Sequence, residues 1–142
     1  MKPFFISLLI LSCFYFSSCL KESAPSITCG KEWNSGRQVV ADTTSEFMHF
    51  DPLIVSFNYG KNFDFDSLKC EFIDEASKVQ YSKNIKVSAK MGSYTIQGKK
   101  NGKEMTAGNF FHAKKTQTVR IRFSSEKSIL AEKQIQILKE RK

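Results

Sequence analysis

The chain lacks the short motifs that mark the common catalytic sites. It has no Gly-x-Ser-x-Gly elbow, no His-Glu-x-x-His pair, no P-loop and no dinucleotide-binding fingerprint. Its only histidines, His49 and His112, have no ligand-like spacing to a cysteine, which argues against a zinc site. We therefore expect a protein that is not an enzyme and that carries no metal or organic cofactor.

The chain also lacks an apolar run long enough to cross a membrane. Residues 4–16 are apolar apart from two serines, whereas a bilayer span needs about 20 apolar residues. Lys2 precedes this run and the small residues Ser17 and Ser18 follow it, which is the order of a secretory signal. Cys19 then stands where an ordinary cleavage site has another small residue.

This arrangement resembles the lipobox of bacterial lipoproteins, in which the cysteine is lipidated and becomes the first residue of the mature chain. Phe16 stands where leucine is usual, as in the relaxed lipoboxes of spirochaetes. The resemblance implies a signal peptide at 1–18, a lipid on Cys19 that holds the protein at the bacterial envelope, and the outer membrane in preference to the inner. Cleavage as an ordinary secretory signal and lipidation at Cys13 are the alternatives.

The segment after the lipobox predicts a short tether and then one domain. Residues 20–26 are polar or small and include a proline, which is typical of a flexible linker. We assign 19–30 to the lipidated cysteine and its tether, and 31–142 to a single domain, because the remaining length is ordinary for one.

Two cysteines remain once Cys13 leaves with the signal and Cys19 takes the lipid. In an oxidising envelope compartment, Cys29 and Cys70 predict a disulfide. Such a bridge would close a loop of about 40 residues and stabilise the fold by about 4 kcal/mol. Two buried unbonded thiols are the alternative.

Acidic residues are few relative to basic ones, with 14 against 22 and a formal net charge of +8. This excess favours an anionic partner, although the same composition is also consistent with ordinary solvated faces. No aromatic residues are interleaved with the basic clusters, so we expect no nucleic-acid partner. The candidate anion-binding residues are Lys99, Lys100, Lys103, Lys114, Lys115, Arg120 and Arg122.

Alternation of apolar and polar residues dominates the chain from about residue 37 onward and is typical of β-strands. Asn101-Gly102 marks a tight hairpin turn, and we expect a β-bulge near 132–133. Residues 66–80 fit either strands or a helix, and we favour strands. The alternating runs include 53–59, 68–72, 87–91, 119–123 and 129–137.

These runs predict an all-β fold of about seven or eight strands. The last two resemble the closing hairpin of immunoglobulin-like bacterial surface domains, and we therefore expect an immunoglobulin-like antiparallel β-sandwich. A small closed β-barrel is the alternative. Two phenylalanine pairs, Phe63 with Phe65 and Phe110 with Phe111, fit either a protein-contact patch or the core.

The functional expectation is a non-catalytic binding or adhesion module on the cell surface, with a protein or an anionic glycan as its partner. The alternatives are a periplasm-facing accessory subunit of an envelope complex and an enzyme inhibitor.

Overall fold

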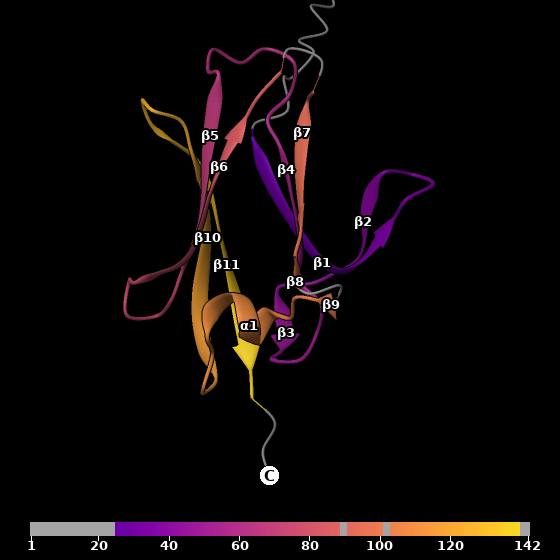
Figure 1. Cartoon of the computed structure of the whole chain (residues 1–142), viewed down its shortest axis with the longest axis vertical. Helices are drawn as coiled ribbons and strands as arrows, with labels where there is room; N and C mark the ends of the chain where they lie inside the picture. Colours follow the sequence, from indigo (N-terminus) through magenta and orange to yellow (C-terminus); the bar gives the residue numbers. More distant parts are fainter. Residues whose placement is uncertain (1–24, 89–90, 101–102, 140–142) are drawn as a thin grey trace, which may run out of the picture.

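Two β-sheets pack face to face in the computed structural model, which describes residues 25–88, 91–100 and 103–139 (Figure 1). One sheet, called sheet A here, has the strand order β2-β1-β4-β7, and the other, sheet B, has the order β3-β11-β10-β5-β6. The strands of sheet A are β1 (Ser26–Asn34), β2 (Val39–Thr43), β4 (Ile54–Asn58) and β7 (Ser93–Gln97). Those of sheet B are β3 (Glu46–Met48), β5 (Ser67–Ile73), β6 (Val79–Lys86), β10 (Gln117–Ser124) and β11 (Ile129–Leu138).

The strand order is that of an immunoglobulin-like sandwich. The first, second and fifth strands of that fold lie side by side in one sheet, and here β1, β4 and β7 do so. The third, sixth and seventh lie together in the other sheet, as β5, β10 and β11 do. The predicted sandwich is confirmed, and the sheets do not close into a barrel. One pairing departs from the antiparallel prediction, because β3 lies parallel to β11.

The core consists of alternate side chains from both sheets. Phe57 of sheet A stacks on Phe123 of sheet B with ring centroids 4.4 Å apart. Phe72 of sheet B stacks on Phe111 at 5.2 Å. Among the described residues, no polar or charged one is buried, so shape and apolar area hold the sheets together.

The segment 66–80, which by its sequence fits either strands or a helix, contains β5 and the start of β6. Leu68, Cys70 and Phe72 of β5 are buried while Lys69 between them is exposed, which is the alternation of a strand with one covered face. The chain then turns at Asp74, whose carboxylate accepts the backbone N–H of Lys78 at 2.9 Å. That hydrogen bond holds the pKa of Asp74 below its ordinary value. The preference for strands at 66–80 is confirmed.

A short helix, α1 (Ala107–Phe111), was not predicted. Thr106 caps its N-terminus by accepting the backbone N–H of Asn109 at 3.2 Å, which satisfies one of the donors left over at a helix start. Phe110 and Phe111 are both buried, and both rings lie against Phe72 of β5, at 4.9 Å and 5.2 Å between ring centroids. The suggested contact patch at this pair is therefore wrong. Phe63 and Phe65 also pack against the core, next to Tyr59.

Two strand boundaries and the position of one β-bulge differ from the sequence expectation. β1 begins at Ser26, so residues 26–30 belong to sheet A and not to a tether. β6 ends at Lys86, and the described part of the run 87–91 lies outside any strand. The ladder between β10 and β11 is regular through Arg122 and Glu132, and its irregularity lies at Phe123–Ser124 instead of at 132–133.

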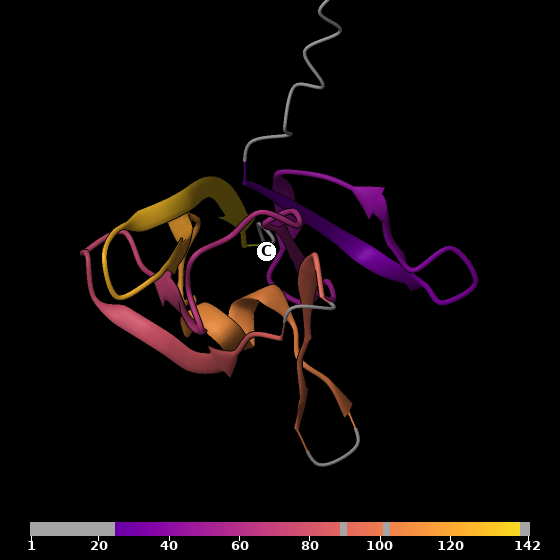
Figure 2. The same cartoon turned by 90° about the horizontal axis from the view of Figure 1, so that it is seen from above.

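Two hairpins project from the sandwich and set up the site described below. The first, called the arm here, consists of β2 and the half of β1 that pairs with it. The second consists of β8 (Lys99–Lys100) and β9 (Lys103–Glu104), and it confirms the hairpin predicted from Asn101-Gly102. Figure 2 shows that the arm and the β8–β9 hairpin leave the sandwich in different directions.

We predict that Gly98→Val destabilises the fold by about 1–3 kcal/mol, because the site has no room for a side chain. A Cβ atom there would lie 2.8 Å from Cβ of Met105 and would overlap the Phe110 ring. The matched control is Gly36→Val at the tip of the arm, where the nearest atom would be 3.5 Å away. Urea unfolding midpoints should fall for the first variant and stay unchanged for the control. Equal midpoints would contradict the tight contact at Gly98.

Candidate functional site

The predicted basic residues do not gather into one patch. Arg122 and Arg120 share the carboxylate of Glu132 across the sheet, with N–O distances of 2.8 Å and 3.7 Å. Lys115 pairs with exposed Glu75 at 3.2 Å. Two carboxylates therefore offset part of the charge of these three cations.

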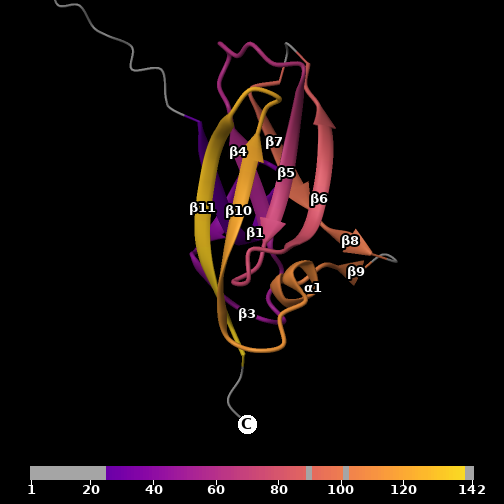
Figure 3. The same cartoon turned by 90° about the vertical axis from the view of Figure 1, so that its left-hand side faces the viewer.

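The other predicted basic residues lie elsewhere. Lys114 is in the turn before β10. Its backbone carbonyl accepts a hydrogen bond of 2.8 Å from the ammonium of Lys139. Lys99, Lys100 and Lys103 lie on the β8–β9 hairpin, which projects beside α1 and away from β10 and β11 (Figure 3). Their side chains are outside the described part of the structure. Anion binding by this hairpin stays a prediction.

The histidines do not form a metal site with other residues. Within the described residues, no group of three or more histidine, cysteine, aspartate or glutamate side chains is placed to hold a metal ion. His112 ends α1 in a left-handed conformation with φ 49° and is exposed, while His49 lies where the chain approaches the other end of that helix. In the same described ranges, no helix is long and apolar enough to span a membrane.

A cleft of about 600 Å³ lies between the arm and the base of the β8–β9 hairpin. This volume is within the usual range of ligand sites, which is about 300–1,000 Å³. The arm supplies one wall, and the residues at the start of β4 and the end of β7 supply the floor. The described lining residues are Lys31, Glu32, Trp33, Asp42, Pro52, Leu53, Ile54, Gln97, Gly98 and Met105.

The wall of the cleft carries an aromatic ring and several charges. Trp33 is the only tryptophan of the chain and is half-buried. Lys31 lies two residues earlier on the same face of β1 and pairs with Asp51 at 2.7 Å. The hydrogen bond that the Lys31 ammonium donates to Asp51, together with the charges of Asp51 and Asp42, raises the pKa of Lys31. The environment beside the cleft thus favours a protonated amine.

The floor of the cleft is apolar and fixed by backbone hydrogen bonds. Leu53 and Ile54 are buried, and the Leu53 N–H donates to the carbonyl of Met105 at 3.4 Å. The N–H of Met105 donates in turn to the carbonyl of Gly98 at 2.6 Å, which closes the base of the β8–β9 hairpin. The floor is therefore preformed from three segments that are distant in the sequence.

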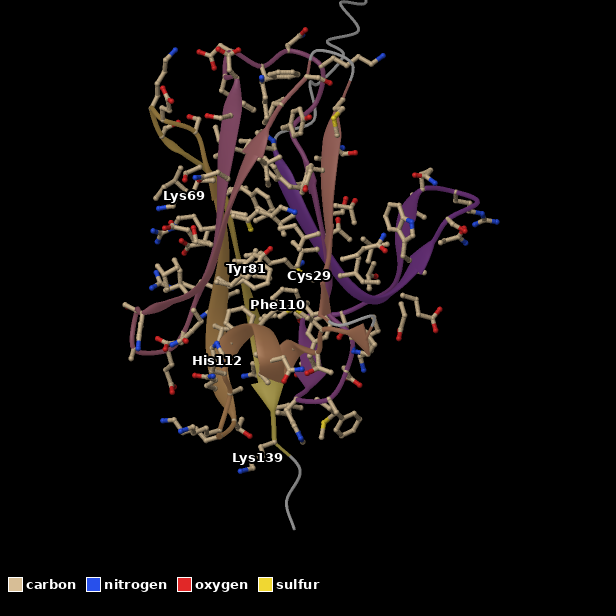
Figure 4. All side chains as sticks on the ribbon, viewed as in Figure 1. Cys29, Lys69, Tyr81, Phe110, His112 and Lys139 are labelled. Carbon is tan, nitrogen blue, oxygen red and sulfur yellow. The ribbon has the colours of Figure 1, made fainter. Side chains whose placement is uncertain are left out.

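A smaller hollow of about 300 Å³ lies on the other side of the hairpin base, between β6 and α1. Tyr81 and Phe110 meet edge to face in it with ring centroids 5.2 Å apart, and His112 lies at its rim (Figure 4). Met105 lines both this hollow and the cleft.

The two cysteines of the domain lie in the core, one on each sheet. Cys29 of β1 (labelled in Figure 4) and Cys70 of β5 are 1 % and 0 % exposed, and both thiols are unbonded in the structure. Burial raises the pKa of Cys29 to about 12 and raises that of Cys70 as well. A thiolate at Cys29 would raise the pKa of Cys70 further. The disulfide between them stays a prediction.

The comparisons with known proteins add one likeness of fold. No protein-family model and no curated protein sequence matches the chain. Among solved structures, an immunoglobulin-like protein of Pseudomonas aeruginosa aligns with a TM-score of 0.48 and 12% identity. The alignment covers 82% of this chain and 98% of that one. The strand order assigns the fold independently of this likeness.

We predict that Cys29 and Cys70 of the folded, reduced protein resist alkylation at pH 8, because burial keeps both thiols protonated and out of reach. Intact mass after iodoacetamide treatment in urea then tests the disulfide. Protein taken directly from the envelope should gain no label at these two cysteines without reductant and two labels after reduction. Labelling in urea without reductant would show that the pair is unbonded in the cell.

Proposed function

We propose that the chain is a lipid-anchored binding module of the bacterial envelope and that its partner docks in the cleft between the arm and the β8–β9 hairpin. An immunoglobulin-like fold does not by itself assign a function, since the same sandwich serves many. The observation that carries the proposal is the preformed cleft, whose apolar floor is combined with a tryptophan and charged side chains.

The position of the cleft relative to the proposed anchor supports this function. Residues 20–25 would separate the lipid on Cys19 from Ser26, and even a fully extended chain of that length reaches only about 20 Å. Ser26 pairs with Asn58 at one end of β4, whereas the cleft begins at Ile54 at the other end of that strand. An anchored domain would therefore keep its tether end near the membrane and present the cleft away from it.

The proposal has two versions, which differ in the side of the membrane on which the domain acts. On the cell surface, the cleft would meet a protein outside the cell, and the role would be adhesion. In the periplasm, the same cleft would dock the domain to an envelope complex as an accessory subunit. Protease treatment of intact cells distinguishes them, because it degrades the domain only in the first case.

We predict that Cys19→Ser abolishes incorporation of radiolabelled palmitate and shifts the protein from the membrane to the soluble fraction. One acyl chain holds a protein only marginally, whereas two or three hold it stably, so loss of the modified residue should release the whole domain. Cys13→Ser is the matched control and should retain both label and membrane association. Labelling that persists in the Cys19 variant would refute the anchor.

We predict that a photo-crosslinking residue in place of Gln97, on the cleft floor, gives a discrete adduct with one partner in intact cells. The control places the same residue at Ser82, which is exposed on β6 and lies outside the lining. No adduct with the control, together with an adduct at Gln97 that disappears in Trp33→Ala, is the expected result. Identical adducts from both positions, or none from Gln97, would rule out the cleft as the docking site.

A further inference from the structure

Building on the function proposed above, we infer that the cleft takes a lysine or arginine side chain presented by the partner protein. Three features of the cleft match such a side chain: carboxylates and an aromatic ring for its charged head, and an apolar floor for its aliphatic stem.

The charges of the wall favour a cation. Glu32 and Asp42 both line the cleft, and Glu32 is exposed to solvent. The only lining cation in the described part is Lys31, whose ammonium is already paired with Asp51. The described charges beside the cleft are therefore the carboxylates of Glu32, Asp42 and Asp51 against the ammonium of Lys31, an excess of negative charge that favours a cation.

The aromatic ring adds a second attraction of the same sign. Trp33 lies on β1 directly after Glu32, opposite Val40 of β2, and lines the same cleft. A cation over an indole face gains about 0.5–1 kcal/mol at an exposed site. Tryptophan is the side chain that offers the strongest such interaction, and the only tryptophan of the chain lines this cleft.

The floor fits the aliphatic part of the ligand. Pro52, Leu53, Ile54 and Met105 provide an apolar surface below the charged wall. Lysine and arginine side chains lay their methylene stems on apolar surface while the charged head stays in a polar environment. A glutamate or a neutral polar side chain would have no comparable use for both surfaces.

The experiment uses the emission of Trp33, which reports on the cleft alone because the chain has no other tryptophan. Full-length protein in a non-ionic detergent is titrated with capped peptides Ser-X-Ser, in which X is lysine, arginine, norleucine or glutamate. Norleucine has an alkyl chain similar to lysine without its charge. The lysine and arginine peptides should give a saturable change in emission at a concentration at least tenfold below any response to norleucine or glutamate.

Variants then assign the effect to the carboxylates. Glu32→Gln with Asp42→Asn should weaken binding of the lysine peptide about tenfold, which corresponds to about 1.4 kcal/mol. Asparagine tolerates the positive φ of 48° at position 42, so the backbone there is preserved. The control is Glu126→Gln in the exposed turn between β10 and β11, which should bind the lysine peptide as the unchanged protein does.

Several outcomes would overturn the inference. Equal binding of the norleucine peptide, or unchanged affinity of the double variant, would show that charge does not select the ligand. Spermidine binding tenfold more tightly than the lysine peptide would assign the cleft to a free polyamine instead of a protein. A saturable response to the glutamate peptide alone would refute the cationic ligand but not the binding function of the cleft. The binding function itself is refuted by the Gln97 crosslinking experiment, if no specific adduct forms there.

Discussion

The stacking of Phe57 on Phe123 between the two sheets is the contact on which the other features depend. With ring centroids 4.4 Å apart, it joins the centre of sheet A to the centre of sheet B. Tyr59 continues this contact toward the tether end, and a second group of rings, with Phe72 stacked on Phe111, lies beside α1 in the same core. Each such pair contributes about 0.5–1.5 kcal/mol beyond its buried area. The sandwich is therefore rigid beneath the cleft, and ligand binding there need not order the fold.

The parts of this fold that follow a period of two could be predicted from the sequence. β4, β5 and β10 alternate buried and exposed residues, and one covered face is the physical cause of that pattern. α1 could not be predicted in the same way, because adjacent Phe110 and Phe111 do not alternate and the helix is only five residues long. Thr106 was the only local signal, since its hydroxyl caps the helix.

The cleft lay beyond sequence reasoning for a different reason. Its floor and wall join residues from Lys31 to Met105, and only the topology of sheet A brings them together. The ion pairs of the predicted basic residues were also beyond sequence reasoning. The register between β10 and β11 sets Glu132 directly opposite Arg122, and the sequence contains no sign of that pairing. Spacing along the chain predicts faces of a strand, but not the neighbours across it.

Met105, at the base of the β8–β9 hairpin, is shared by the cleft and the smaller hollow. Its side chain borders the cleft on one side and the Tyr81–Phe110 hollow on the other. Methionine is flexible and fills irregular space readily, so this side chain can change its rotamer to fit an occupant of either hollow. If a ligand in one hollow moves Met105 into the other, the two affinities become linked, and each ligand then alters the affinity of the other by the same factor.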